Sequence, residues 1–524
     1  MIKRMLCAVA LLLVGGAIPA SAAMTQPVQV EGGQVLGVPG NDPSIMTFKA
    51  IPFAAPPVGN LRWRAPEPVV PWKGIHATDK YPPSCIQDIP TTNLPWTYEF
   101  MPHNEIGEDC LYLNVFTPAA SASQKLPVFV YIHGGGYRQG GTAVPIYDGE
   151  GLAKKGLVVV TINYRVAVLG FLALPELSKE SSHQVSGNYG LLDQIAALKW
   201  VQKNISRFGG DPKNVTIDGQ SAGGGAVHDL TASPLARGLF HRAIVQSGGS
   251  SIVRGGTNGP AALANAEKEG EKFAELVGAH SLAELRAMSW QKFVEAASGP
   301  NAPRFAPIVD GYVLPAPAMT VISEGKQNDV PTLTGSVLGE LGGLTGPPKP
   351  LSSAEFQEKA KQRFGDAADE FLKLYPAATD AEAAAAQKQS AMDQALVAQY
   401  LWARERAKTA KTKVYEYVWD HTLPGPDSAK YGAFHSSDLL YTLNTLHTSD
   451  RPFTGDDQKL AAMMSSYWAN FAATGDPNGK GLPAWPAIDD KPQVMEVGDK
   501  TQPIPLANSP EKIRFFEKYL METK

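Results

Sequence analysis

Cysteine is scarce in this chain: 3 of its 524 residues are Cys, and no His or Cys cluster has the spacing of metal ligands. We therefore expect no metal site. No long basic run occurs and the net charge is −4 at pH 7, so nucleic acid is not expected as a partner. No internal repeat is evident. With 44% hydrophobic and 19% charged residues, the composition excludes a disordered, collagenous or coiled-coil chain.

Long apolar runs are confined to the N-terminus. Residues 1–22 begin with two positive charges, continue as a short apolar stretch and end in Ala20-Ser21-Ala22, a small-residue cleavage pattern. We predict a signal peptide that is cut after Ala22 or Ala23, and a secreted or periplasmic product. The alternative is an uncleaved anchor, but the stretch is short for a bilayer. No later segment reads as transmembrane, so no membrane span is expected in the mature chain.

Two cysteines, Cys85 and Cys110, remain once the signal peptide is removed. Because exported proteins mature in an oxidising compartment, we predict one disulfide between them. The chain-entropy model assigns a disulfide that closes such a loop about 3 kcal/mol of stabilisation. Two buried free thiols are the alternative.

Apolar, β-branched runs in the chain are typical of buried parallel strands. They alternate with segments whose apolar residues recur at helical spacing. The predicted strands are 127–132, 157–163, 214–218, 241–246 and 413–419, and the predicted helices are 188–204, 458–473 and 510–520. Alternating strands and helices predict an α/β fold with a mostly parallel sheet and helices on both of its faces.

No linker separates independent domains, so residues 23–524 are expected to form a single domain. Residues 24–125 are rich in Pro, Trp and turn residues, which favour short strands and loops. Between about 260 and 410 the chain is rich in Ala, Glu and Lys and is expected to be helical. We interpret this stretch as a helical lid inserted into the domain, with plain scaffold as the alternative.

The strongest motif is Gly219-Gln220-Ser221-Ala222-Gly223, directly after the predicted strand 214–218. In a nucleophile elbow, small residues on both sides of the serine allow a tight turn from strand to helix. The turn exposes the serine Oγ at the edge of the sheet, above the start of the next helix. The sequence therefore predicts Ser221 as a nucleophile. An ordinary Gly-rich turn is the alternative, because the five-residue pattern alone is weak.

A second glycine-rich motif, His133-Gly134-Gly135-Gly136, follows the predicted strand 127–132. Consecutive glycines let backbone N–H groups approach a substrate oxyanion closely. Together with the N–H of Ala222, those of Gly135 and Gly136 would form an oxyanion hole with three donors. A flexible turn is the alternative.

A serine nucleophile needs a base, and in this kind of site the acid and the histidine follow the serine in the chain. Most lone histidines are surface or satisfied core residues, and the pattern of the sequence does not choose among the candidates. The histidines after Ser221 are His228, His241, His280, His421, His435 and His447.

Further motifs occur in a fixed order along the chain. They are Phe53–Gly59, Arg62–Pro66, Glu108–Val115, Asn163–Arg165, Gly187–Gln194, Phe208–Pro212, Gln246–Gly248 and Ala484–Ala487. With these motifs and the two glycine-rich ones, the chain resembles the type-B carboxylesterase and cholinesterase family of α/β-hydrolases, in particular secreted bacterial carboxylesterases. The resemblance extends from about residue 28 to the C-terminus. So many ordered matches are specific for the family but not for a substrate.

The resemblance implies a Ser–Glu–His triad. Ser221 matches the nucleophile, His435 the base and Glu340 the acid. The family usually has Asn and Gly close to this acid, where the present chain has Val and Leu. Asp310 is the alternative acid, although its position is usually structural in the family.

The family also usually has Glu immediately before the serine, whereas this chain has Gln220. Gln keeps the size and the hydrogen-bonding reach of Glu but not its charge. A nearby negative charge favours protonated His. We therefore predict a lower pKa for His435 than in relatives that carry Glu.

The resemblance implies that Cys85 pairs with Cys110, and it implies two structural ion pairs, Arg62 with Glu108 and Arg165 with Asp193. In the family, the loop between these cysteines flanks the entrance to the active site. Its aromatic residues either line an apolar entrance or simply pack the loop. They include Trp96, Tyr98 and Phe100.

The sequence thus predicts a secreted serine carboxylesterase that hydrolyses small-molecule esters through an acyl-enzyme, without a metal or an organic cofactor. The alternatives are a non-catalytic binding protein of the same family, a lipase, and a detoxifying esterase of narrow specificity. Non-catalytic members have typically lost the serine, whereas Ser221, Glu340 and His435 are all present here.

Overall fold

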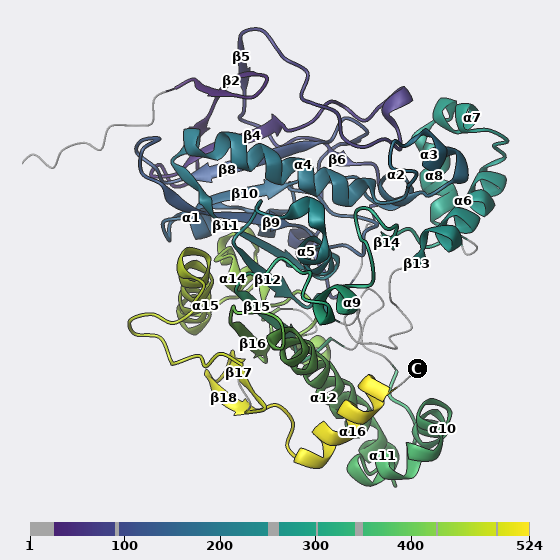
Figure 1. The fold of residues 1–524 in the computed structure, drawn as a ribbon. Coiled ribbons are helices and arrows are strands. Elements are labelled where there is room, and N and C mark those ends of the chain that lie inside the picture. The colour runs from purple at the N-terminus through teal and green to yellow at the C-terminus, as the bar shows by residue number, and fades with distance from the viewer. Residues whose placement is uncertain are drawn as a thin grey trace, which may run out of the picture.

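The structure is a computed structural model that describes residues 26–89, 94–249, 261–299, 302–340, 349–425, 428–488 and 491–522. The predicted signal peptide lies outside these residues and stays a prediction. Within them, 11 strands form the central sheet, in the order β18-β17-β16-β15-β12-β11-β9-β10-β8-β4-β3 (Figure 1). In this order, the neighbouring strands β17, β16, β15, β12, β11, β9 and β10 run parallel to one another. The sheet is extended by antiparallel pairing with β18 at one end and with β8 at the other.

The predicted strands are present as β9, β10, β11, β12 and β16. The bounds of the central strands are β3 (Val38–Pro39), β4 (Met46–Pro52), β8 (Tyr112–Thr117), β9 (Leu126–Ile132), β10 (Val158–Ile162), β11 (Gly210–Gln220), β12 (Arg242–Gln246), β15 (Thr332–Val337), β16 (Val414–Trp419), β17 (Gln493–Val497) and β18 (Gln502–Pro505). Smaller sheets consist of β1 (Val28–Val30), β2 (Gly33–Leu36) and β5 (Ile75–Ala77), of β6 (Ser84–Cys85) and β7 (Ile106–Gly107), and of β13 (Ala261–Ala262) and β14 (Ile308–Val309).

The predicted helices are present as α4, α15 and α16. The α-helices of the described residues are α1 (Glu150–Ala153), α2 (Ala167–Phe171), α3 (Pro175–Glu180), α4 (Tyr189–Asn204), α5 (Ala222–Ala232), α6 (Leu263–Val277), α7 (Leu282–Ala287), α8 (Trp290–Ala297), α9 (Ala318–Ser323), α10 (Ser353–Phe364), α11 (Ala368–Leu374), α12 (Asp380–Ala407), α13 (Ser428–Tyr431), α14 (Leu439–Thr442), α15 (Gly455–Thr474) and α16 (Pro510–Glu522).

The side chains of β9 alternate between two hydrophobic cores, as the two-residue period of a strand requires. Val128 and Val130 belong to the core that contains residues of α4 and α5. Phe129 and Tyr131 belong to the core that contains residues of α15. Helices therefore cover both faces of the sheet, as predicted, and its parallel strands are buried on both sides.

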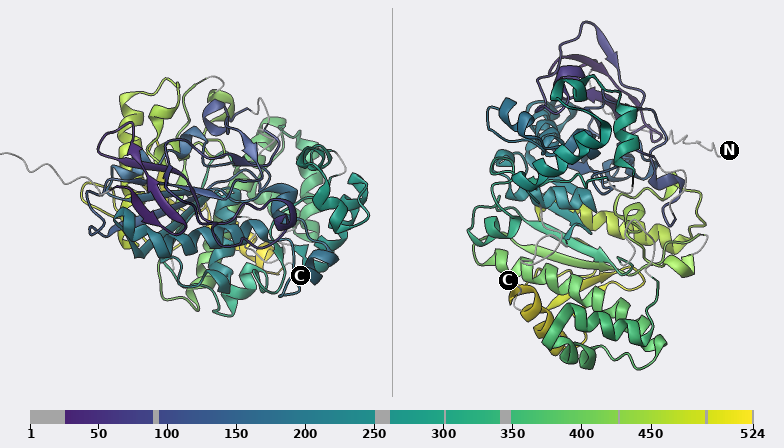
Figure 2. Two further views of the ribbon diagram at one scale, coloured as in Figure 1. Left: turned by 90° about the horizontal axis from the view of Figure 1, so that it is seen from above. Right: turned by 90° about the vertical axis from the view of Figure 1, so that its right-hand side faces the viewer.

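Residues 260–410 are largely helical, as expected, but β15 lies among them and takes a central place in the sheet between β12 and β16. Helices α6 to α8 share the core of α4 and lie beside α2 and α3 (Figure 1). Helices α10 and α11 pack with α12 and α16 at the end of the molecule opposite the small sheet of β1, β2 and β5 (Figure 2). The strand β15 thus divides residues 260–410 into two groups of helices. The role of this stretch as a lid stays a prediction.

Candidate active site

Ser221 lies at the turn between β11 and α5, with φ 58° and ψ −123°. Residues other than Gly rarely adopt this conformation. A Cβ at Gly219 would lie 2.4 Å from the carbonyl group of Gly223, and one at Gly223 would lie 2.1 Å from the carbonyl oxygen of Ile132. The N–H of Ser221 donates to the carbonyl of Gln246 on β12 at 2.8 Å. The turn is therefore closely packed against backbone, which is why the motif requires glycines.

The loop after β9 begins beside this turn, since a Cβ at Gly134 would lie 3.2 Å from the Cβ of Ser221. Gly135 and Gly136 have φ values of 106° and 65°, which favour glycine. Within the described residues, the N–H groups of Gly135, Gly136 and Ala222 donate to no acceptor. Free N–H donors beside a serine are what the oxyanion of an acyl-transfer reaction needs.

Glu340 and His435 meet although they are 95 positions apart, with His435 Nδ1 2.6 Å from Glu340 Oε2. Glu340 follows β15 and His435 follows β16, and these two strands are parallel neighbours. The N–H of Gly339 donates to the carbonyl of Ala433 at 2.8 Å, which joins the two loops just before the pair. The topology of the sheet therefore brings the predicted acid and the predicted base together.

The two side chains differ in exposure, with 12% of His435 and 26% of Glu340 accessible. Burial alone would raise the pKa of Glu340, but the charge and hydrogen bond of His435 lower it overall. Burial alone would lower the pKa of His435, but the Glu340 carboxylate, aided by Asp438, raises it overall. The pair is thus a stable carboxylate beside an imidazole that accepts a proton readily.

Gln220 is 2% exposed, and its amide Nε2 lies 3.2 Å from Nε2 of His435. An imidazole that donates its Nδ1 proton to Glu340 has a lone pair at Nε2, which accepts a proton of this amide. Among the hydrogen bonds of the described residues, none joins Ser221 Oγ to His435. Such bonds are often long in sites without substrate. The sequence predicted an electrostatic effect of Gln220 on His435, but not this direct contact.

Comparison with known proteins adds the decisive observation. The protein-family model described as "Carboxylesterase family" matches residues 24–516. The chain belongs to the carboxylesterase family. It is 36% identical over 496 residues to fumonisin B1 esterase of Sphingopyxis macrogoltabida, which covers 92% of this chain and 89% of that protein.

Mammalian relatives match over a similar length. The carboxylesterase is 34% identical over 516 residues to liver carboxylesterase 1F of Rattus norvegicus, which covers 91% of this chain and 90% of that protein. It is 33% identical over 523 residues to cocaine esterase of Homo sapiens, and the match covers 94% of this chain and 90% of that protein. The chain is therefore a carboxylic ester hydrolase with the α/β-hydrolase fold.

Two of the other candidate histidines of the carboxylesterase are engaged elsewhere. His228 packs edge-on against Trp402, and burial lowers its pKa to about 3. His421 has Nδ1 2.6 Å from Asp499 and Nε2 3.0 Å from Asp457. Neither ring meets a predicted acid or the elbow.

The remaining candidates show no contact with Ser221 or with a predicted acid among the described residues. Nδ1 of His241 accepts the backbone N–H of Val215 at 3.2 Å. Val215 lies in the middle of β11, whereas Ser221 follows the end of that strand. His280 and His447 are exposed. Asp310, the alternative acid, accepts two backbone N–H groups of its own turn at 3.0 and 2.9 Å and the amide of Asn188 at 2.9 Å. Its carboxylate is therefore engaged in organising that turn.

The aromatic residues of the cysteine-bounded loop divide into two kinds. Trp96 donates from Nε1 to the carbonyl of His435 at 3.0 Å and packs edge-on against Phe434. Phe100 also packs edge-on against Phe434, whereas Tyr98 is 67% exposed. Sequence reasoning missed Trp96 as a support of the His435 loop. Its only sequence signal was a Trp in this loop, since the partner lies 339 positions away.

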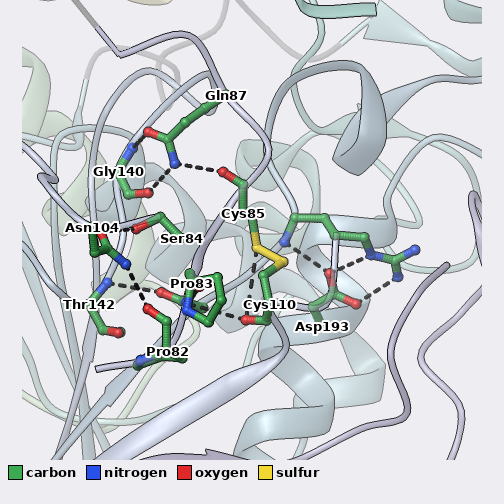
Figure 3. The surroundings of a disulfide bond; sticks show 12 residues. Pro82, Pro83, Ser84, Cys85, Gln87, Asn104, Cys110, Gly140, Thr142 and Asp193 are labelled. Carbon is green, nitrogen blue, oxygen red and sulfur yellow. Dashed lines mark hydrogen bonds and ion pairs between the residues drawn. A yellow bond between two sulfur atoms is a disulfide. The ribbon is translucent and has the colours of Figure 1, made fainter. Parts of the chain in front are cut away.

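The predicted disulfide between Cys85 and Cys110 is present (Figure 3). Both implied ion pairs are present too: Arg62 with Glu108, and Arg165 with Asp193 at 2.7 Å. Within the described residues, no group of His, Cys, Asp and Glu could hold a metal ion. No helix in that part of the chain combines the length and apolar character that crossing a membrane requires.

Proposed function

We propose that this chain is an exported serine carboxylesterase that uses Ser221 as nucleophile, His435 as base and Glu340 as the acid of the triad. The observation that carries the proposal is the 2.6 Å contact between His435 and Glu340, in loops at the edge of the sheet where the elbow lies. Of the six candidate histidines, His435 is the one that meets a predicted acid.

In the first half-reaction, Ser221 Oγ attacks the ester carbonyl carbon while His435 Nε2 takes the hydroxyl proton. The oxyanion accepts the N–H groups of Gly135, Gly136 and Ala222, and removing one such donor typically costs about 3–4 kcal/mol. The carbonyl then re-forms, the ester C–O bond breaks, and His435 protonates the leaving alcohol. In the second half-reaction, His435 deprotonates a water molecule that attacks the acyl carbon. The bond from that carbon to Ser221 Oγ then breaks, His435 returns the proton to Oγ, and the acid is released.

Gln220 acts on the base in this proposal. Its amide favours the neutral imidazole that carries its proton on Nδ1, since it donates to the Nε2 lone pair of His435. A carboxylate in its place would accept but not donate, and would favour the imidazolium instead. Gln220 therefore keeps His435 neutral down to a lower pH, and its amide must release Nε2 before Ser221 can donate a proton there.

We further propose that the signal peptide over residues 1–22 directs export and that the mature chain, 23–524, is a single domain. The disulfide between Cys85 and Cys110 supports maturation in an oxidising compartment, because such bonds are rare where thiols are kept reduced. The partners of the mature protein are small-molecule esters, with no nucleic acid.

The test is hydrolysis of p-nitrophenyl esters from acetate to palmitate by the wild type, Ser221→Ala and the control Ser233→Ala. Ser233 lies at the far end of α5 and caps a short turn, so its loss leaves the elbow intact. We expect Ser221→Ala to lose activity by about 10⁴-fold or more with an unchanged Tm, and Ser233→Ala to retain it. Folded wild type without activity on any ester would contradict the proposal, and activity confined to emulsified long-chain esters would favour the lipase alternative.

A further inference from the structure

Gln87 follows the disulfide-bonded Cys85 by two residues, is 2% exposed, and lies against the loop that follows β9 (Figure 3). Its Oε1 accepts the N–H of Gly140 at 2.7 Å, and its Nε2 donates to the carbonyl of Gly140 at 2.7 Å and to that of Cys85 at 2.9 Å. The two bonds with Gly140 run in opposite directions, like the paired bonds between strands. One side chain therefore holds both polar groups of the Gly140 backbone.

Gly140 lies on the segment that returns from the proposed oxyanion hole. The carbonyl of Gly135 accepts two backbone N–H groups at 3.0 and 3.1 Å, so the chain turns back on itself there. A Cβ at Gly140 would lie 2.3 Å from Nδ1 of His133 and 2.7 Å from the carbonyl oxygen of Gly134. The Gly140 backbone thus packs directly on the residues that lead into Gly135 and Gly136, and a shift of one would shift the other.

The disulfide supports the same returning segment from a second side. Asn163 Oδ1 accepts the N–H of Thr142 at 2.9 Å, while its Nδ2 donates to the carbonyls of Pro83 at 3.0 Å and Cys110 at 3.1 Å. The residues around Cys85 and Cys110 are therefore joined to the returning segment at Gly140 through Gln87, and at Thr142 through Asn163 (Figure 3).

We propose that Gln87 is a positioning residue for the oxyanion hole: supported by the disulfide, it holds Gly140 and thereby sets the direction of the N–H groups of Gly135 and Gly136. This inference rests on the proposed function of that loop. Oxyanion donors act where charge develops in the transition state, so a small displacement lowers kcat more than it weakens substrate binding. Nothing in the sequence pattern assigned Gln87 a role.

The test compares Gln87→Met and Gln87→Glu with the matched control Gln202→Met. Met has a similar size but removes all three bonds, whereas Glu keeps the acceptor for the Gly140 N–H and loses both donated bonds. Gln202 on α4 also donates two bonds to backbone carbonyls, those of Pro212 and Leu239 at 2.9 Å each. Pro212 lies at the opposite end of β11 from Ser221, so the control removes comparable bonds away from the site.

Active sites are first counted by the burst of p-nitrophenol released from a p-nitrophenyl dialkyl phosphate. Then kcat per titrated site, KM for p-nitrophenyl acetate and the inhibition constant of an aryl trifluoromethyl ketone, a transition-state mimic, are measured. For Gln87→Met we expect kcat per site to fall about 10- to 100-fold, and the inhibition constant to rise by the same factor. KM should change less than about threefold. Gln87→Glu should show at least as large a fall, because its second carboxylate oxygen would face the carbonyl oxygens of Gly140 and Cys85, to which Nε2 now donates. Gln202→Met should keep wild-type values per site.

A Gln87→Met protein with wild-type kcat per site and inhibition constant would overturn the proposal, even if its Tm is lower. Should that variant fail to fold, Gln87→Glu decides in the same way, because a fall in kcat per site supports the proposal and wild-type kinetics overturn it. A wild-type protein that releases no burst and hydrolyses no ester would overturn the proposed function itself. The two failures are therefore distinguishable.

Discussion

Two adjacent residues, Gln220 and Ser221, lie at the centre of the candidate site. Ser221 has a φ of 58°, and such a conformation costs about 1–3 kcal/mol in a residue other than Gly. Hydrogen bonds of its backbone to Gln246 on β12 and Gly225 on α5, at 2.8 and 2.9 Å, hold it there. Gln220 ends β11 with its side chain toward His435. The strand and the helix together, rather than local preference, therefore fix both side chains.

The charge at position 220 should set the acid limb of the pH–rate profile. In the proposed mechanism His435 must be neutral to act as base, so activity is expected to fall as the pH falls through its pKa. In Gln220→Glu the added carboxylate stabilises the imidazolium and raises that pKa, so the midpoint of kcat/KM should move to higher pH. The measurement is kcat/KM from pH 4 to 9 for both proteins. A midpoint that stays in place or moves down would contradict the role assigned to Gln220.

The choice between Glu340 and Asp310 as the acid can also be tested with single residues. Glu340→Gln removes the charge that holds the Nδ1 proton of His435, and comparable losses in serine hydrolases reach about 10⁴-fold in kcat. Asp310→Asn should leave kcat per titrated site unchanged, because Asp310 bonds to backbone N–H groups of its own turn. The opposite ranking of the two variants would refute the assignment of the triad.

At the level of strands and helices, the candidate site consists of loops that follow the C-terminal ends of neighbouring parallel strands in the central sheet. The segment between Cys85 and Cys110 supports two of these loops, through Gln87 and through Trp96. Glu99 within it forms a buried ion pair with Arg451 at 2.6 Å, which ties it to the chain after α14. The cysteine-bounded segment therefore braces the proposed oxyanion loop and the His435 loop together.

Removing the disulfide should lower stability by an amount set by the loop it closes. Cys85 and Cys110 are 25 positions apart, for which the chain-entropy model predicts a loss of about 3 kcal/mol in the free energy of unfolding. Guanidinium unfolding of the Cys85→Ser, Cys110→Ser double variant measures this loss, and wild type treated with a reductant should match it. Equal unfolding midpoints for the wild type and the double variant would contradict the prediction.

Buried strands with apolar, β-branched sequences, such as β9 and β10, were predictable because their composition matches their burial. The strand β15 was missed for the opposite reason. Its residues Thr332, Thr334 and Ser336 are polar yet buried, so its sequence does not resemble a core strand. Ser336 accepts a hydrogen bond from Gln399 of α12, a partner that no local pattern reveals.

The same distinction between local and distant determinants separates the parts of the site. Ser221 and the glycine loop could be proposed as site residues from the sequence alone, because each motif is continuous in the chain. His435 could not be chosen from six histidines by local pattern, since the pairing with Glu340 arises from β15 and β16 lying side by side. The family resemblance supplied that choice. The contacts of Gln87 and Trp96 were not predictable either, because their partners are distant in the sequence.

At the scale of the whole molecule, buried carboxyl groups link stability to pH. Burial raises the pKa of Asp218 to about 8 and that of Asp438 to about 6, and the charge of Asp438 contributes to the rise at Asp218. In the unfolded chain both groups titrate near about 3.9. At these two groups the folded protein therefore binds more protons than the unfolded chain between about pH 4 and 8, so they make the free energy of unfolding fall as the pH rises through that range. Buried His228, whose pKa is lowered to about 3, has the opposite effect below about pH 6.5, where the unfolded chain takes up a proton at this residue.

The Tm should accordingly be higher at pH 5 than at pH 8, and Asp218→Asn should narrow that difference. Asp456→Asn is the control, because Asp456 has a 90% exposed side chain. Below about pH 4 the free energy of unfolding should instead fall as the pH falls, because of Asp457. Burial would raise the pKa of Asp457, but hydrogen bonds from Tyr441 and Thr454 lower it to about 2, so the unfolded chain takes up a proton there first. Measuring the Tm by thermal unfolding from pH 3 to 9 checks the expected change both above and below pH 4. An equal or higher Tm at pH 8, or an unchanged difference in Asp218→Asn, would contradict this account.

Covalent labelling tests whether Ser221 is the nucleophile of this carboxylesterase. The wild type is treated with a p-nitrophenyl dialkyl phosphate and digested with trypsin, and peptide 214–237, which contains Ser221, is analysed by mass spectrometry. We expect one dialkyl phosphoryl group per chain, on Ser221, and a loss of ester hydrolysis proportional to the labelled fraction of the protein. Labelling of another residue, or full loss of activity without a label on Ser221, would contradict it.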